Sequence, residues 1–183
     1  MKKTQTLFLL DEIEQLARAL LDISQFLKQY RLKFPIANKI QLPKIPPALS
    51  ERIAIDLIQR KAILIDEVIH ECFLGGTVAD VIAKTEDSRT LKIEVKSTGS
   101  SSFQNFTKKD IQADYLIWIH FDNFFYDEEK PQIEIFILKD PRSHYPVRDT
   151  RILLGLKDFI IKPVTKFSFH FKEFYNPRND VSI

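Results

Sequence analysis

The spacing of apolar residues changes once along the chain, at the pair Gly75-Gly76. Before this pair, apolar residues recur every three or four positions, as they do on one face of an α-helix. After it, they alternate with polar residues or form continuous runs of strand length, which indicates β-strands. A chain that begins with helices and continues with strands must pack those helices against a sheet, so the spacing predicts an α/β fold.

Two helices joined by a proline-rich connection are expected before the glycine pair. Residues 5–30 carry a helical apolar stripe with acids near the start, where the helix dipole favours negative charge. Residues 34–48 contain four prolines and are expected to lack regular structure. The second helix is expected to begin near Ser50, which suits an N-cap, and to run to about Leu74, where Gly75 stops it.

Strands dominate the expected structure after the glycine pair. Residues 77–83 and 90–96 should pair as an antiparallel hairpin around a polar turn at 84–89. The other expected elements are a Ser/Gly-rich loop at 97–102, a short helix at 104–113, and strands at 115–121, 132–138 and 164–171. Two of these strands, 115–121 and 132–138, are continuously apolar, so they are expected in the centre of a mixed sheet that is covered by helices.

The length of 183 residues predicts one domain, and charge divides it into three parts. Residues 1–45, the N-terminal helix and its connection, carry a net charge of +4, and so do residues 139–183, the C-terminal strands and tail. Residues 46–138, the expected catalytic core, carry −6. This distribution suits an enzyme that acts on a polyanion, because the acidic core can bind a cation and the basic flanks can bind phosphates. A mosaic surface without function would give the same totals.

The cellular location is predicted from the cysteine count and the N-terminus. Cys72 is the single cysteine, so no intrachain disulfide can form. The apolar run at residues 7–10 is too short for a signal peptide or a membrane span. We therefore expect a cytoplasmic protein with no membrane partner.

Two carboxylates and a lysine are expected to meet on the hairpin. Asp80 stands in an otherwise apolar stretch, where an unpaired carboxylate would be costly to bury. Glu94 follows on the neighbouring strand, about 5 Å away in a paired hairpin, and Lys96 lies on the same face of that strand. The two carboxylates suit Mg²⁺, and the carbonyl of Val95 could add an oxygen ligand. Such a site suits phosphodiester hydrolysis, with Lys96 orienting water or stabilising developing charge.

Asp80 followed by Glu94-Val95-Lys96 resembles the motif of the PD-(D/E)XK nuclease superfamily, and the layout over residues 60–122 is similar to that of type II restriction endonucleases. Ala79 stands where the family motif has proline. The resemblance implies a restriction-endonuclease-like mixed sheet flanked by helices and magnesium-dependent cleavage of double-stranded DNA. It also implies that Asp80 and Glu94 are metal ligands and that Lys96 is the catalytic lysine.

Further site residues are predicted on both sides of this motif. Family members often donate another acid from the helix before the hairpin, so Glu71 is a candidate, with Glu67 and His70 beside it. Polar residues that leave the site directly are candidates to contact phosphates and base edges: Ser97, Thr98, Gln104, Asn105, Lys108 and Lys109. Phe103 and Phe106 are expected to anchor in the core. The second Glu-x-Lys sequence, Glu128-Glu129-Lys130, is expected to face solvent in a polar turn.

Several functions stay open at this point. The leading hypothesis is a homodimeric type II restriction endonuclease, because cutting both strands with one site per subunit calls for a symmetric pair. A nuclease of DNA repair, recombination or transposition would keep the fold but read DNA structure. A non-catalytic DNA-binding or partner-binding subunit would keep the fold alone. The hairpin could also belong to an unrelated α/β domain in which Asp80 pairs with a lysine.

Overall fold

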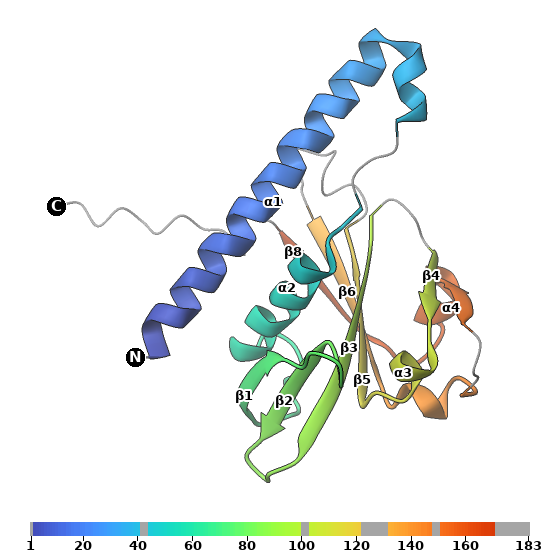
Figure 1. Cartoon of the computed structure of the whole chain (residues 1–183). Coiled ribbons are helices and arrows are strands. Elements are labelled where there is room, and N and C mark those ends of the chain that lie inside the picture. The colour runs from blue at the N-terminus through green and yellow to red at the C-terminus, as the bar shows by residue number, and fades with distance from the viewer. Residues whose placement is uncertain (1, 41–43, 100–102, 122–131, 148–150, 171–183) are drawn as a thin grey trace, which may run out of the picture.

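A mixed six-stranded sheet forms the centre of the computed structural model, which describes residues 2–40, 44–99, 103–121, 132–147 and 151–170 (Figure 1). The strands are ordered β1-β2-β3-β5-β6-β8, and all neighbours are antiparallel except β3 and β5, which are parallel. Their bounds are Ile69–Leu74 (β1), Val81–Thr85 (β2), Thr90–Thr98 (β3), Tyr115–His120 (β5), Gln132–Lys139 (β6) and Thr165–His170 (β8). The predicted α/β class and the mixed sheet are therefore confirmed.

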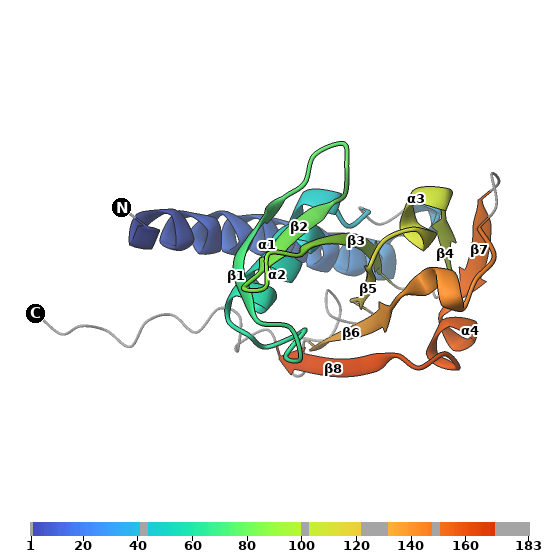
Figure 2. The ribbon, with the colours of Figure 1, turned by 90° about the horizontal axis from the view of Figure 1, so that it is seen from below.

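Helices and a small second sheet cover the two faces of the central sheet. The helices are α1 (Lys2–Lys33), α2 (Pro47–Gln59), α3 (Lys108–Ile111) and α4 (Leu156–Ile160), with 3₁₀ helices η1 (Pro35–Lys39) and η2 (Pro141–Ser143). β4 (Phe103–Phe106) and β7 (Ile152–Gly155) pair as the antiparallel second sheet. Figures 1 and 2 show α1 and α2 on one side of the central sheet and α3, α4 and β4 on the other.

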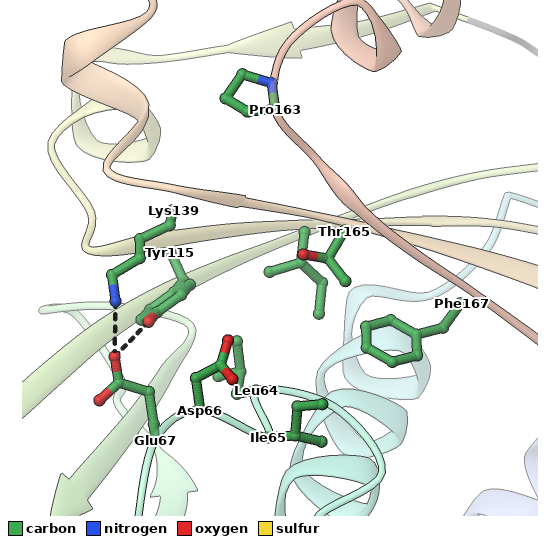
Figure 3. A pocket seen from close by; sticks show the side chains of 10 residues that line it. Leu64, Ile65, Asp66, Glu67, Tyr115, Lys139, Pro163, Thr165 and Phe167 are labelled. Carbon is green, nitrogen blue, oxygen red and sulfur yellow. Dashed lines mark hydrogen bonds and ion pairs between the residues drawn. The ribbon is translucent and has the colours of Figure 1, made fainter.

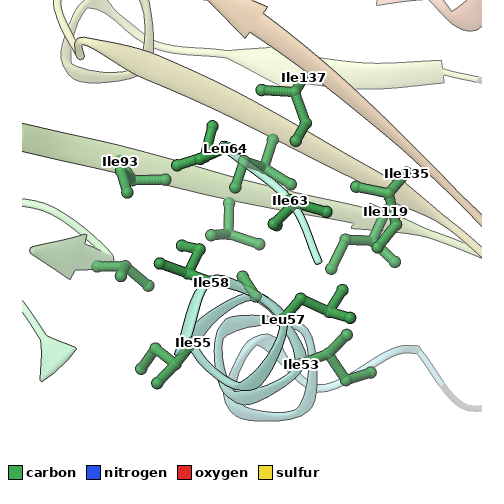
Figure 4. Packing of buried hydrophobic residues seen from close by; sticks show 14 of the residues in the cluster. Ile53, Ile55, Leu57, Ile58, Ile63, Leu64, Ile93, Ile119, Ile135 and Ile137 are labelled. Atoms are coloured by element: carbon green, nitrogen blue, oxygen red, sulfur yellow. The ribbon is translucent and has the colours of Figure 1, made fainter. Parts of the chain in front are cut away.

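Each face of the sheet has its own buried cluster. On the first face, Ile53, Leu57 and Ile58 of α2 pack against aliphatic residues of β3, β5 and β6 (Figure 4). On the second face, Trp118 of β5 contacts the rings of Phe106 and Phe159, with centroids 5.6 and 5.3 Å away. β5 contributes to both clusters and is buried along its whole length, which is why its sequence is continuously apolar.

α1 reaches beyond the sheet. Its middle packs against α2 and the first cluster through Leu16 and the buried Leu20, while its C-terminal part and η1 extend past the ends of the strands (Figure 1). The predicted helix at 5–30 is confirmed, and the helix is longer at both ends. The proline-rich connection was expected to lack regular structure, but η1 forms one short turn within it. In the part of the chain that the structure describes, no helix is long and apolar enough to cross a membrane.

The prediction of one helix over residues 50–74 is wrong after Gln59. α2 ends there, and Lys61 and Leu64 have positive φ angles of 57° and 52°, which a right-handed helix cannot include. Residues 69–74 form the edge strand β1, in which Cys72 alone is buried. The apolar spacing of this segment fits both structures, and the tertiary structure decided between them, since β1 pairs with β2 and buries Cys72 in the first cluster.

Two smaller predictions around the hairpin are also corrected. The hairpin itself forms as predicted, but Asp80 lies just before β2 because residues 75–80 make a turn, with Gly76 at a φ of 65°. The helix expected at 104–113 is shorter, because residues 104–106 belong to β4 and only α3 (Lys108–Ile111) is helical. Phe106 is buried as expected, whereas Phe103 is 61% exposed. The strands predicted at 115–121, 132–138 and 164–171 are confirmed as β5, β6 and β8.

Candidate active site

The two predicted acids lie next to each other beside the hairpin. The ammonium of Lys109 is 3.0 Å from Oε1 of Glu94 and 3.3 Å from Oδ1 of Asp80, so both carboxylates face the same small volume. The other oxygen of Asp80, Oδ2, accepts a hydrogen bond of 2.9 Å from the backbone N–H of Val95. This bond holds Asp80 against β3. The carboxylates of Asp80 and Glu94 therefore lie together, as expected from the sequence.

Lys96 is held close to these acids by a residue that the sequence reasoning missed. Its ammonium lies 2.8 Å from Oδ1 of Asp110, whose side chain is 1% exposed. Asp110 also closes a capping box with Thr107 at the start of α3, which fixes its carboxylate in place. The Thr-x-x-Asp spacing is a sequence signal for such a cap, so the position of Asp110 could have been predicted. Its contact with Lys96 could not.

A cleft of about 390 Å³ opens beside the two acids. It is lined by Val78, Lys92, Glu94, Lys108, Lys109, Gln112 and Ala113. Three of these residues are lysines, so the cleft presents positive charge around a buried carboxylate. Such a cleft suits a polyanion whose reacting phosphate approaches the acids.

Burial controls the ionisation of Glu94. Removal from water, followed by the negative charge of Asp80, raises the pKa of Glu94 from its ordinary 4.5 to about 8, although the hydrogen bond and charge of Lys109 act in the opposite direction. Burial also opposes the charge of Lys109, but Glu94 and Asp80 together leave the pKa of Lys109 above its ordinary value. Burial and the neighbouring negative charge therefore favour the protonated form of Glu94 near neutral pH, and further positive charge in this volume would favour its carboxylate form.

We predict that Glu94→Gln makes stability less dependent on pH. A carboxyl whose pKa is higher in the folded than in the unfolded chain keeps its proton longer when folded. Its contribution to the free energy of unfolding therefore falls as pH rises from about 4.5 to about 8, and glutamine cannot titrate. Urea unfolding of both proteins at these two pH values measures the difference. Equal pH dependence of the two proteins would show that Glu94 does not titrate in this range.

Glu51 of α2, which the sequence analysis did not single out, is an acid close to the two carboxylates. Burial and the charge of Asp80 raise the pKa of Glu51, while Lys109, Arg52 and Lys96 lower it, so Glu51 shares the electrostatic environment of the site. Glu71, the sequence candidate, does not: it lies on the exposed edge strand β1, 2.7 Å from the ammonium of Lys84. The prediction that a helix carries Glu71 is wrong because its segment is a strand, and the helix that precedes the hairpin is α2.

Glu67 forms a separate cluster rather than part of the site. Its carboxylate, with 4% of the side chain exposed, accepts from the Tyr115 hydroxyl and lies 3.0 Å from the ammonium of Lys139 (Figure 3). It also lies 2.9 Å from Nη2 of Arg89. The Tyr115 hydroxyl and these cations hold the pKa of Glu67 below its ordinary value despite burial. A cavity of about 90 Å³ lies beside it. His70 is exposed on β1.

The predicted nucleic-acid contacts divide into accessible and buried residues. Lys108 and Lys109 line the cleft, and Asn105 is exposed on β4. Gln104 is half-buried and donates from Nε2 to the carbonyl of Ser97, also half-buried. Thr98 is buried, and its hydroxyl contacts Nδ1 of His120 and Nε1 of Trp118, so it cannot reach DNA in this conformation. The second Glu-x-Lys sequence, 128–130, lies outside the described residues.

The two acids fit a magnesium ion by their chemistry. Mg²⁺ prefers oxygen ligands and is commonly held by one or two carboxylates while several waters complete its shell. Asp80 and Glu94 already share one cation, the ammonium of Lys109, which occupies the position between them. No group of three or more His, Cys, Asp or Glu residues that could hold a metal occurs within the described ranges. An ion here would therefore depend on these two carboxylates and water, with Glu51 as the nearest further acid of α2.

The arrangement as a whole joins three carboxylates and two lysines from three parts of the chain: the turn before β2, the strand β3 and the helix α3. The carboxylates can hold a cation, and Lys96 and Lys109 can each stabilise negative charge on a substrate. Comparisons of this chain with protein-family models, curated proteins and solved structures found no match.

Proposed function

We propose that this chain is a magnesium-dependent endonuclease of the PD-(D/E)XK type that hydrolyses double-stranded DNA, acting as a type II restriction enzyme. The observation that carries the proposal is the meeting of Asp80 and Glu94 at a single cation, with Lys96 two residues further along β3. The mixed sheet with helices on both faces supports it, since the resemblance of the motif implies this architecture.

Each residue of the site has a defined task in this proposal. Asp80 and Glu94 would hold magnesium, which when bound polarises the scissile phosphate and lowers the pKa of water. Lys96 would orient the attacking water or stabilise the charge that develops on the phosphate. Asp110 would position Lys96, because its buried carboxylate fixes the ammonium at 2.8 Å. Lys92 and Lys108 at the cleft would contact neighbouring phosphates.

A non-catalytic binding protein is the second candidate, and one contact favours it. Lys109 satisfies both carboxylates without a metal, as a lysine would in an unrelated α/β domain. Calorimetry separates the two proposals. A nuclease binds magnesium in a manner that depends on Asp80 and Glu94, whereas a binding protein of this kind shows no such dependence.

The direct test is digestion of a defined plasmid with and without magnesium. A restriction enzyme gives discrete fragments only when magnesium is present. A nuclease of repair, recombination or transposition gives smears, or cleaves only at junctions and ends. Intact plasmid under all conditions, together with no magnesium binding, would contradict the proposal and favour the second candidate.

We predict that Lys109→Met increases the affinity for divalent cations by about tenfold or more. In the wild-type chain an incoming cation must displace the ammonium from Asp80 and Glu94, whereas methionine has a similar shape and no charge. Titration calorimetry with Mn²⁺ or Mg²⁺ measures the effect. Lys108→Met, a neighbouring lysine of the same cleft, is the control and should change the affinity much less. Weaker binding by the Lys109 variant would show that this lysine supports the site rather than competes for it.

A further inference from the structure

An apolar stripe runs along the part of α1 that extends beyond the sheet. Ile23, Phe26, Tyr30 and Phe34 follow one another at three- and four-residue spacing, and they are 48%, 64%, 38% and 48% exposed. The ring centroids of Phe26 and Tyr30 are 5.9 Å apart, and those of Tyr30 and Phe34 are 4.8 Å apart. The rings thus form a continuous surface along the helix.

The stripe continues onto the segment after the helix. Ile36 of η1 is 77% exposed, and Ile40, just after η1, is 43% exposed. Together with Ile23, Phe26 and Tyr30 of α1 and Phe34 directly after it, they expose roughly 600 Å² of mainly apolar surface, at the upper end of what monomeric proteins show. A stable complex buries roughly 800 Å² on each partner, and somewhat more than half of that area is apolar. The apolar stripe together with the polar residues beside it is therefore large enough for such an interface.

The part of the chain that the structure describes leaves this stripe uncovered. α1 packs against α2 and the first cluster through a neighbouring side of the helix, which carries Leu16, Leu20 and the buried Ser24. Phe26 is the most exposed of the three rings, and none of the described residues covers it. A surface of a second molecule could therefore pack against it.

Charge along the same helix favours a second copy of the chain in the opposite direction. Residues 11–22 carry four acids and one base, whereas residues 28–39 carry four bases and no acid. Two antiparallel copies would place each acidic segment against the basic segment of its partner, with the two-fold axis near residue 25. Parallel copies would place like charges together. The acidic and basic segments flank the apolar residues Ile23 and Phe26, which would meet near that axis.

We propose that α1 and η1 form the surface through which two copies of this chain pair as an antiparallel, two-fold symmetric dimer. An isologous contact of this kind is self-complementary, since each copy supplies both the acidic and the basic segment. The proposal gives a surface to the homodimer expected for the proposed function. The pairing is measured without DNA or magnesium, so its failure would leave the proposed nuclease activity untouched.

Sedimentation velocity of the full chain tests the surface. The wild-type chain is expected to sediment as a dimer of the 21.4 kDa chain, and Phe26→Glu is expected to weaken dimerisation at least about tenfold. Ile161→Glu is the matched control, because Ile161 is 79% exposed and lies outside the stripe. It should remain a dimer. A monomeric wild-type chain, or a Phe26→Glu variant that pairs as tightly as wild type, would overturn the proposal.

Charge reversal tests the antiparallel direction. Lys33→Glu with Lys39→Glu should weaken the dimer, and adding Asp11→Lys with Glu12→Lys should restore it, since the opposite charges face each other again. Circular dichroism checks that each variant keeps its helix content. Parallel pairing predicts that the first two substitutions strengthen the dimer by removing repulsion, and that result would refute the antiparallel arrangement.

Discussion

Asp80→Asn and Lys96→Met are each expected to lower magnesium-dependent DNA cleavage by about 10³-fold or more while leaving the fold intact. Asparagine keeps an oxygen that can accept the Val95 N–H, so the contact that holds residue 80 against β3 is preserved. What it removes is one of the two carboxylate charges that meet at the cation. Methionine at position 96 retains the length of lysine but cannot orient water or stabilise phosphate charge. Cleavage of a defined plasmid, followed over time, measures both variants.

Glu71→Gln is the control for this prediction. Glu71 carries the same charge and is close to Asp80 in sequence, but it lies on the exposed edge strand and pairs with Lys84. Its substitution should change cleavage less than about threefold, because loss of an exposed ion pair changes the energy of a protein by only about 0–1 kcal/mol. Undiminished cleavage by Asp80→Asn or Lys96→Met would remove that residue from the mechanism.

Trp118→Ala is expected to lower the free energy of unfolding by about 3–5 kcal/mol, a large part of the stability of a single domain. Trp118 is fully buried, and its ring meets Phe106 and Phe159 edge-on in the second cluster. Its indole N–H also donates to the Thr98 hydroxyl at 2.8 Å, so the substitution leaves both a large void and a buried hydroxyl with one partner fewer. Urea unfolding followed by circular dichroism measures the loss.

Leu153→Ala is the matched comparison for Trp118→Ala. Leu153 lies on β7, beside the same cluster, but is 63% exposed, so its truncation should change the free energy of unfolding by no more than about 0.5 kcal/mol. A loss of less than about 1 kcal/mol in Trp118→Ala would mean that the aromatic cluster does not hold the second face of the sheet together.

The positions of the two metal-binding candidates were predictable because they depend on local pairing. The alternation of β3 and the polar turn before it define a hairpin, and a hairpin brings residue 80 next to residue 94 whatever packs around it. In the same way, the continuous apolar run of β5 predicts a strand that is buried on both faces. Local spacing therefore gave the α/β class, the central strands and the convergence of Asp80 with Glu94.

Other parts of the site depend on contacts between segments that are distant in sequence. Residues 69–74 have apolar spacing that suits a helix, and they became an edge strand because β2 offered backbone partners. This change removed Glu71 from the site and left Glu51 as the acid of the preceding helix. The contact of Asp110 with Lys96 likewise exists only because α3 packs next to β3.

The sequence by itself thus determined that the hairpin brings the two acids together, because a period of two and a short turn are local properties. Only the tertiary structure decided which other charges surround them. The ammonium of Lys109 lies between the acids because the chain returns from β4 through α3 to the edge of β3. The spacing of residues in the sequence does not predict this path of the chain. The path depends on burial of the aromatic cluster on the second face of the sheet.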